Sequence, residues 1–429
     1  MSTIDLSLKP KIKAAVIYPE IMERCVGISA ESRLSEAVGL ALAINLDVVH
    51  QEIIKLRNIK PATLIGQGVI DRLLPLISAD NIELLVVDSG LSPIQQRNLE
   101  KKLQIKVIDR TALILEIFGE RAQTNEGKLQ VELAHLSYQR SRLVRSWTHL
   151  ERQRGGAGFL GGPGETQIEL DRRIIDDKIL RIKKDLEKVR QTRKIQRVSR
   201  QRVPYPVVAL VGYTNAGKSS LFNRLSLGNV LAKDMLFATL DTTLRRLDLP
   251  SGRTVILSDT VGFISDLPHE LVMAFRATLE EVLEADIVVH VRDVANPDSR
   301  EQCHDVINVL ENIGLNNIKE DKKYIEVLNK SDLLDQQQKS VIKDNCLLVS
   351  ALTGEGCDKF LQELDNRLSQ DHKIMEIRLL ASEGKKISWI YENSEVLSSN
   401  LIEDMLYLKF RISSASAAKL DKLLDKQTN

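Results

Sequence analysis

The first part of the chain alternates short apolar runs with stretches of helical periodicity. Residues 14–17, 84–87 and 107–108 are the apolar runs, and residues 34–44 and 94–103 have the helical pattern. Strands that alternate with helices are typical of an α/β layer with a mostly parallel sheet. We therefore expect an N-terminal α/β domain over residues 1–125. It shows no catalytic cluster, and we interpret Gly66-Gln67-Gly68 as a turn.

After residue 126 the apolar positions change to two long seams with alternating spacings of four and three. Two such seams joined by a loop predict an antiparallel helical hairpin over residues 126–203. The first seam comprises Leu129, Leu133, Leu136, Leu143, Trp147 and Leu150, and the second comprises Ile168, Ile175, Ile179, Ile182, Leu186 and Val189.

A glycine-rich loop, residues 154–164, joins the two seams. Six of its eleven residues are glycine, and Phe159 and Leu160 lie at its centre, where we expect them to be exposed. Glycine keeps side chains away from whatever the loop approaches. A plain connector that ends at a proline explains the same composition, so both interpretations stay open.

Four apolar runs in the second half of the chain each end in a polar motif. They are residues 207–211, 255–257, 324–328 and 347–349, and they predict a domain with a mostly parallel sheet over residues 204–370. Its start is marked by Pro204-Tyr205-Pro206. Residues 371–429 predict a small α/β C-terminal domain, with a helix at 388–391 and a strand at 405–410. The expected fold class is thus multidomain α/β.

The first motif, Gly212-Tyr213-Thr214-Asn215-Ala216-Gly217-Lys218-Ser219, has the pattern GxxxxGK[ST]. Because it lies between a strand and a helical stretch, it points backbone N–H groups and a helix N-terminus at a phosphate group. Lys218 is expected to bind the β- and γ-phosphates, and the Ser219 hydroxyl to bind Mg²⁺. An isolated match would be a flexible glycine loop, but the flanking elements favour a nucleoside triphosphatase.

Asp259-Thr260-Val261-Gly262 follows the second apolar run. The Asp259 carboxylate can hold Mg²⁺ through water, and the Gly262 N–H can meet the γ-phosphate. Alone, this tetrapeptide is at least as often a turn after a strand. Phe263 comes next, where small signalling GTPases carry the glutamine that orients the attacking water, so we expect slow intrinsic hydrolysis.

The base is indicated by Asn329-Lys330-Ser331-Asp332, which follows the third run. A carboxylate at Asp332 can accept from N1–H and the 2-amino group of guanine, whereas adenine has neither donor. Sites that demand such a bond discriminate by roughly 10⁴ or more. A helix N-cap by Ser331 or Asp332 is the alternative. Ser350-Ala351-Leu352 would complete the pocket with a bond from the Ala351 N–H to the base oxygen.

A further segment must supply a threonine hydroxyl to Mg²⁺ and a backbone N–H to the γ-phosphate. Phe237-Ala238-Thr239-Leu240-Asp241-Thr242-Thr243 lies between Lys218 and Asp259, where such a segment is needed. Its three threonines compete for the role, and Thr243 is the main alternative to Thr239. A threonine that does not bind Mg²⁺ is explained by strand propensity before Leu244.

The composition adds one regional signal. Sixty basic against fifty-nine acidic side chains give a formal net charge of +1, but residues 178–202 hold eleven Lys or Arg against Asp185 and Glu187, a net charge of +9. Cys25, Cys303, Cys346 and Cys357 form no CxxC pair and are interpreted as reduced core cysteines. No leader pattern and no apolar run of membrane-spanning length is present in the sequence, so we expect a soluble cytoplasmic protein.

Two further motifs are much more specific than the phosphate loop: Gly155-Gly156-Ala157-Gly158 and Gly161-Gly162-Pro163-Gly164-Glu165-Thr166-Gln167. With them, the sequence resembles the HflX family of ribosome-associated GTPases from about residue 10 to 370. The resemblance implies a GTPase that binds the large ribosomal subunit and splits stalled or idle ribosomes. It also implies that Thr239 binds Mg²⁺, that residues 237–241 line the nucleotide, and that the N-terminal domain and hairpin face the ribosome. Lys218, Thr239 and Gly262 are then the candidate catalytic residues.

A different class of function fits the same residues. A GTP-dependent switch could recruit a protein partner or attach peripherally to a membrane, because a basic helix is more often a solvated face than an RNA reader. We expect a monomer in either case. Salt-dependent co-sedimentation with ribosomes separates the two classes.

Overall fold

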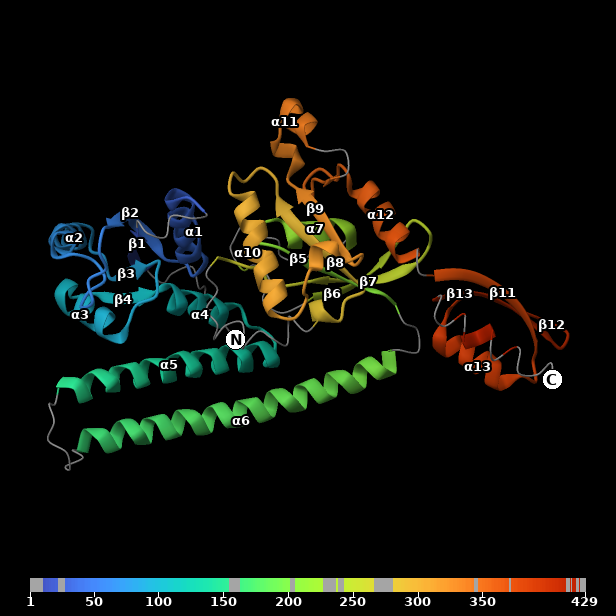
Figure 1. The fold of residues 1–429 in the computed structure, drawn as a ribbon, viewed down its shortest axis with the longest axis horizontal. Coiled ribbons are helices and arrows are strands. Elements are labelled where there is room, and N and C mark those ends of the chain that lie inside the picture. Colours follow the sequence, from blue (N-terminus) through green and yellow to red (C-terminus); the bar gives the residue numbers. More distant parts are fainter. Residues whose placement is uncertain are drawn as a thin grey trace, which may run out of the picture.

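The computed structural model contains three sheets and a long helical hairpin (Figure 1). It describes residues 11–21, 28–153, 163–200, 205–226, 237, 243–265, 281–342, 346–369, 372–413, 417, 419–421 and 424. Within these ranges, the side chains of residues 144–153, 163–168, 190, 193–200, 372, 392 and 395 are not described. The predicted multidomain α/β class is confirmed.

The N-terminal domain is a parallel sheet with strand order β2-β1-β3-β4 and helices on both faces. Successive β1 residues point to opposite faces, so Val16 packs with α1 and α4 while Ile17 packs with α2 and α3. The elements are β1 (Lys13–Ile21), α1 (Ala30–Ala43), β2 (Asp47–Leu56), α2 (Gln67–Asp80), β3 (Leu84–Val87), α3 (Pro93–Leu103), β4 (Lys106–Asp109) and α4 (Arg110–Arg121).

Two details of this domain differ from the sequence analysis. The edge strand β2 and the helix α2 were not predicted, because β2 mixes polar and apolar side chains at an exposed edge. The interpretation of Gly66-Gln67-Gly68 as a turn is wrong, since Gly66 is the N-cap of α2 and Gln67 begins the helix. A glycine pair at a helix start has the same local composition as a turn.

The hairpin consists of α5 (Asn125–Gln153) and α6 (Pro163–Arg200), which lie side by side (Figure 1). Leu136, Ile179 and Ile182 are buried between them, and four more predicted seam residues pack around these three: Leu129, Leu133, Ile175 and Leu186. The seam side chains Trp147, Leu150 and Ile168, and the loop with Phe159 and Leu160, lie outside the described side chains.

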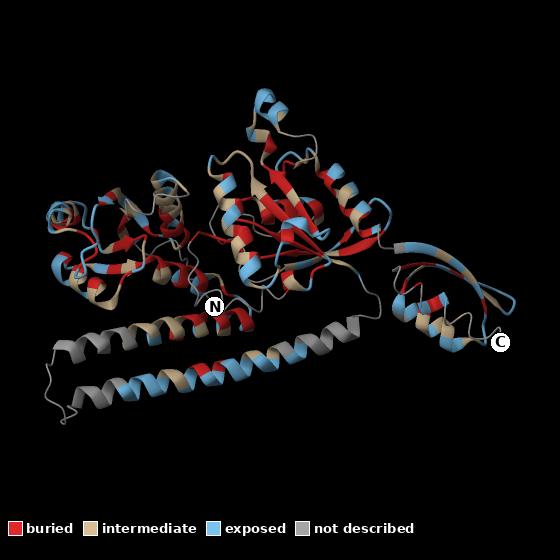
Figure 2. Ribbon diagram, in the orientation of Figure 1, coloured by how far each residue is buried: buried red, intermediate tan, exposed pale blue. Residues whose placement is uncertain are grey.

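The domain expected over residues 204–370, which we call the G domain, is built on the six-stranded sheet with order β10-β9-β8-β5-β7-β6. In this sheet β6 alone among these strands is antiparallel to its neighbour. Figure 2 shows the central strands of this sheet as buried. Its elements are β5 (Val207–Val211), α7 (Lys218–Ser226), β6 (Thr243–Asp248), β7 (Thr254–Asp259), β8 (Ile287–Asp293), α10 (Ser299–Asn312), η3 (Ile318–Glu320), β9 (Tyr324–Asn329), η4 (Ser331–Leu333), α11 (Gln336–Val341), β10 (Leu347–Leu348) and α12 (Cys357–Ser369).

The C-terminal domain is an antiparallel sheet with order β11-β13-β12, and its core includes side chains of a helix over residues 384–393 and of the helical residues Ala417 and Leu420. Its elements are β11 (His372–Leu380), α13 (Gly384–Asn393), β12 (Glu395–Ile402) and β13 (Met405–Ser413). Leu408, Phe410 and Ile412 alternate along β13 and are almost fully buried. Among the residues described, no helix combines the length and apolarity that a membrane span needs.

The hairpin contact generates a stability prediction. Ile179→Ala should remove about 2–4 kcal/mol of local stability, because Ile179 is only 4 % exposed. Leu180→Ala should cost under about 1 kcal/mol, because Leu180 is 57 % exposed. A multidomain chain does not unfold in one step, so the readout is amide hydrogen exchange of α5. Equal protection in the two variants would contradict the buried seam.

Candidate functional site

The four sequence motifs meet at one edge of the G-domain sheet. Strands β5, β7, β9 and β10 run parallel within it, and each predicted motif follows the carboxyl end of one of these strands. Crevices outside the carboxyl ends of parallel strands are where open α/β sheets bind ligands. The topology therefore collects residues that are 140 positions apart in sequence into a single site.

The phosphate loop requires its glycines. Gly217 has φ +86°, and a Cβ there would lie 2.2 Å from the Asn329 Nδ2 atom. A Cβ at Gly212 would lie 2.2 Å from the Val291 carbonyl oxygen of β8. Only glycine allows the loop to sit this close to the neighbouring strands, and α7 begins directly after it at Lys218.

Lys218 is a buried cation at the centre of the loop. Its ammonium donates to the carbonyl oxygens of Gly212 at 3.1 Å and Tyr213 at 2.8 Å. Burial lowers the pKa of Lys218 to about 8, and the Asp259 carboxylate opposes that effect. A buried ammonium surrounded by neutral carbonyls gains strongly from an anionic ligand, which is the role predicted for Lys218.

The oxygen atoms expected to surround Mg²⁺ lie together. The Ser219 hydroxyl donates to Asp259 Oδ2 at 2.7 Å, and Asp259 is fully buried. Hydroxyl and carboxylate oxygens beside a phosphate site are the ligands that Mg²⁺ prefers, so this pair fits the ion. Thr239, the threonine favoured by the family resemblance, lies outside the described residues with Ala238, Leu240, Asp241 and Thr242.

Two other residues of the predicted Thr239 segment are described. Thr243 is the first residue of β6 and pairs with Asp259 of β7, as its strand propensity predicts. Phe237 is 2 % exposed and packs edge-on against Phe118 of α4, with ring centroids 4.7 Å apart. The Phe237 ring therefore contacts the N-terminal domain.

Gly262 approaches the phosphate loop closely. A Cβ on Gly262 would lie 2.9 Å from Thr214 Cγ2 and 3.0 Å from Lys218 Nζ, so the backbone of Gly262 is beside the ammonium. The neighbouring Thr260 hydroxyl donates to the Leu210 carbonyl at 2.6 Å. Phe263 is 3 % exposed and packs with Tyr213 and Val282 in the G-domain core.

The predicted base-binding residues form one hydrogen-bonded group. Asn329 Nδ2 donates to the Ala216 carbonyl at 2.9 Å, and Asn329 Oδ1 accepts from the Ala351 N–H at 3.0 Å. The Ser350 hydroxyl donates to Asp332 Oδ1 at 2.5 Å. The Ala351 N–H, expected to meet a base oxygen, thus already has a protein acceptor that it must share or release. Lys330 forms an ion pair with Asp293 at 2.7 Å. The Ser331 N–H donates to the Val349 carbonyl at 3.1 Å, and the Leu352 side chain is exposed.

Sequence reasoning missed the residues that support this site from other elements. Arg224 of α7 donates through Nε to the Ala351 carbonyl at 3.0 Å and also donates to the Leu352 carbonyl, so it holds the segment of residues 350–352 in place. Glu36 and Arg110 of the N-terminal domain bond Tyr213 and Ser265. No local motif marks these side chains, because they act only through contacts between distant segments.

Comparisons with known proteins place the chain in a family. Four family descriptions match: "GTP-binding GTPase N-terminal" at residues 31–119, "GTP-binding GTPase Middle Region" at 121–200, "50S ribosome-binding GTPase" at 207–330 and "HflX C-terminal domain" at 335–429. GTPase HflX of Magnetococcus marinus is 44 % identical over 416 residues, which cover 96 % of this chain and 95 % of that protein. The chain belongs to the HflX family of GTPases.

A second HflX relative is similarly close. GTPase HflX of Escherichia coli is 44 % identical over 349 residues, covering 80 % of this chain and 81 % of that protein. These relatives and the matched GTPase region confirm the predicted GTPase activity. Among solved structures, a GTP-binding protein of Sulfolobus solfataricus in complex with GDP is 22 % identical, matches over 84 % of this chain and 99 % of its own, and has a TM-score of 0.44.

The Asp332 carboxylate generates a specificity prediction. Asp332→Asn should weaken GTP binding by roughly 10²-fold or more and gain binding of xanthosine triphosphate, because xanthine has a carbonyl where guanine has its amino group. Nucleotide titrations measure both affinities. Asp335→Asn is the matched control, since Asp335 caps α11 and is exposed. Unchanged GTP affinity in Asp332→Asn would refute the assignment.

The depressed pKa of Lys218 generates a prediction about protons. Without nucleotide the pKa is about 8, and bound phosphates should raise it, so binding takes up a proton above that pH and affinity falls as pH rises through it. GDP binding should take up about half a proton at pH 8 and about a tenth at pH 7. Calorimetry in buffers of different ionisation enthalpy measures this uptake. A binding enthalpy independent of buffer at pH 8 would contradict it.

Proposed function

We propose that this HflX GTPase binds the large ribosomal subunit in its GTP-bound state and splits stalled or idle ribosomes. The observation that carries the proposal is a set of exposed basic side chains on α6 in a chain whose residues 207–330 match a 50S ribosome-binding GTPase. Lys178, Arg181, Lys183, Lys184 and Lys188 are all exposed on that helix. Basic side chains along a helix suit the phosphates of ribosomal RNA, whose attraction falls with salt.

The roles of the site residues belong to the same proposal. Ser219 and Thr239 would bind Mg²⁺ directly and Asp259 through water, while Lys218 and the Gly262 N–H would stabilise the charge on the transferred phosphoryl group. Guanine would be read by residues 329–332 and 350–352. The proposal divides the protein into four domains, residues 1–125, 126–203, 204–370 and 371–429. It also places the protein in the cytoplasm.

Hydrolysis should depend on the ribosomal partner. Phe263 occupies the position after Gly262 and its ring is packed in the G-domain core, so it offers no hydrogen bond to an attacking water. A water-orienting group is worth several orders of magnitude in such reactions. We infer that the large subunit completes the site, either by reshaping the 259–265 segment or by supplying a polar group.

A second candidate function is recruitment of a protein partner. Leu170, Ile174 and Leu180 of α6 are 56 %, 46 % and 57 % exposed, and apolar side chains at the surface of a helix favour contact with another protein. This alternative predicts binding that is insensitive to salt and independent of ribosomes.

Charge reversal on α6 tests the proposal. Lys183→Glu with Lys184→Glu should weaken co-sedimentation with large subunits at least tenfold at moderate salt and slow the GTP-dependent loss of light scattering from intact ribosomes. Lys322→Glu with Lys323→Glu, an equal charge change at exposed positions of the G domain, should leave both nearly unchanged. GTP affinity should be normal in both variants. Full splitting activity in the α6 variant would refute an RNA-facing hairpin.

A further inference from the structure

A buried polar cluster joins the N-terminal domain to the G domain. The Arg110 guanidinium, at the start of α4, donates through Nη1 to Asp88 Oδ1 at 2.5 Å and through Nη2 to the Ser265 carbonyl at 2.9 Å. Nη2 also pairs with Glu36 of α1. Arg110 and Asp88 are each 5 % exposed and Ser265 is 1 % exposed. A buried ion group of this kind fixes geometry, because losing one partner leaves a charge uncompensated.

The phosphate loop enters the same cluster through a side chain. The Tyr213 hydroxyl donates to the Glu36 carboxylate, accepts from the Ser265 N–H at 2.8 Å, and lies 2.6 Å from the Ser265 hydroxyl. Burial and the nearby Glu36 carboxylate raise the pKa of Tyr213 above its ordinary value, so the hydroxyl keeps its proton. One tyrosine therefore links the phosphate loop, the 259–265 segment and the N-terminal domain.

The backbone holds the 259–265 segment against the phosphate loop at the same place. The Thr214 N–H donates to the Phe263 carbonyl at 2.7 Å, and the Phe263 N–H donates to the Gly212 carbonyl at 3.0 Å. Ile264 and Val261 pack in the hydrophobic cluster of α1 and α4. Gly262, whose N–H would meet the γ-phosphate, thus lies between the ammonium of Lys218 and a surface formed by the N-terminal domain.

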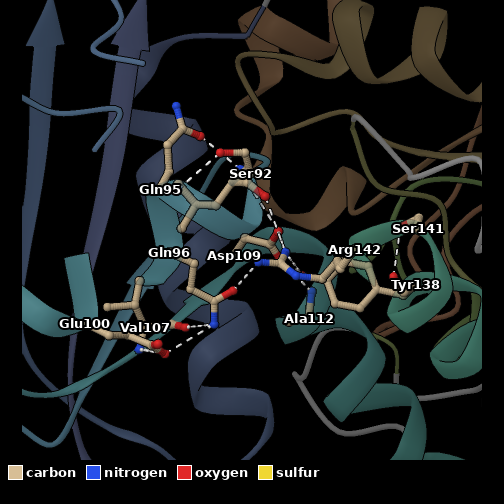
Figure 3. Close-up of polar contacts among 11 residues, drawn as sticks. Ser92, Gln95, Gln96, Glu100, Val107, Asp109, Ala112, Tyr138, Ser141 and Arg142 are labelled. Carbon is tan, nitrogen blue, oxygen red and sulfur yellow. Dashed lines mark hydrogen bonds and ion pairs between the residues drawn. The ribbon is translucent and has the colours of Figure 1, made fainter. Parts of the chain in front are cut away.

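The residue before Arg110 faces the hairpin instead. Asp109 caps α4 by accepting from the Ala112 N–H at 2.8 Å, and it also accepts from the Tyr138 hydroxyl at 2.9 Å and from Arg142 Nη1 at 3.3 Å. Figure 3 shows Tyr138 and Arg142 of α5 directed at Asp109, with Arg142 also bonded to Gln96. Asp109 therefore contacts the hairpin, and the adjacent Arg110 contacts the 259–265 segment.

We propose that the Asp109-Arg110 turn couples the γ-phosphate to the helical hairpin, with Arg110 and Tyr213 as positioning residues that hold Gly262 in place for the γ-phosphate. Segments that contact the γ-phosphate are bistable elements, ordered by GTP and released after hydrolysis. The Tyr213 carbonyl accepts from Lys218, but the side chains of Tyr213 and Arg110 bond Ser265 of this segment. Loss of these side-chain bonds should therefore affect GTP more than GDP. The coupling is a property of the isolated chain and does not depend on the proposed action on ribosomes.

Nucleotide affinities of two tyrosine variants test the nucleotide side of the coupling. Tyr213→Phe removes the hydroxyl and keeps the buried ring, and it should lower the affinity for a non-hydrolysable GTP analogue about fivefold relative to GDP. Tyr324→Phe is the matched control, because its buried hydroxyl bonds His290 at 2.7 Å inside the G domain. Tyr324→Phe should leave the ratio of the analogue affinity to the GDP affinity unchanged. A circular dichroism spectrum equal to that of the unaltered protein shows that Tyr213→Phe is folded, and equal losses for both nucleotides would overturn the proposal.

Arg110→Lys is a second variant with a separate expectation. Lysine keeps the positive charge beside Asp88 and Glu36 but loses the planar fork that reaches Ser265 at the same time. It should therefore shift the analogue-to-GDP ratio in the same direction as Tyr213→Phe. A ratio equal to that of the unaltered protein would show that the guanidinium does not position the segment.

Hydrogen exchange tests the hairpin side. Amides of residues 136–143 in α5 should exchange more slowly with the GTP analogue than with GDP in the unaltered protein, and Tyr213→Phe should abolish this difference. Arg142→Lys should abolish it as well, while retaining the nucleotide preference of the G domain. No nucleotide-dependent difference in the unaltered protein, or a difference that persists in Tyr213→Phe, would overturn the coupling.

Discussion

Parallel pairing of β5 with β7 on one side and β8 on the other is the constraint on which the site depends. It places the phosphate loop, the Mg²⁺ carboxylate and the base-reading strands at one edge, and it brings the Val291 carbonyl so close to Gly212 that no side chain fits there. The glycines of the loop are therefore required by the sheet as well as by the phosphate. A change in strand register would displace every ligand-binding group together.

Two buried cations near this edge, Arg110 and Lys218, differ in whether their charge is already compensated within the protein. Arg110 is paired with the Asp88 and Glu36 carboxylates, and although burial alone would lower the pKa of Arg110, the carboxylates raise it, so it stays charged without a ligand. Lys218 donates to carbonyl oxygens and has a pKa lowered by burial. Arg110 therefore has a structural role, whereas the charge on Lys218 is stabilised most when a phosphate group binds.

The sequence predicts best those features that local chemistry determines. Val207–Val211, the loop after it and the long seams of α5 and α6 follow from strand, glycine and heptad patterns. Strand β2 is not predicted because Asp47–Leu56 has neither a continuous apolar run nor strict alternation of apolar and polar residues. The start of α2 is wrongly predicted as a turn because helix N-caps and turns use the same residues. Arg110, Glu36 and Ser265 were beyond prediction, since the contact of Arg110 with Ser265 joins positions 155 residues apart. The Ala351 N–H likewise has an acceptor, Asn329, that no local motif indicates.

The size of the coupling limits what GTP can do in the proposed function. A cluster of a few hydrogen bonds supports a coupling free energy of about 1–3 kcal/mol, which changes an affinity by roughly 5- to 150-fold. In the proposed function, separating the two ribosomal subunits would require more than this, so the energy would come from the binding of the hairpin and N-terminal domain to the large subunit. GTP would then determine when that binding surface is held in place, and hydrolysis would determine when it is released. Tyr213 of the phosphate loop suits this role, because its hydroxyl bonds Glu36 of the N-terminal domain and Ser265 of the 259–265 segment.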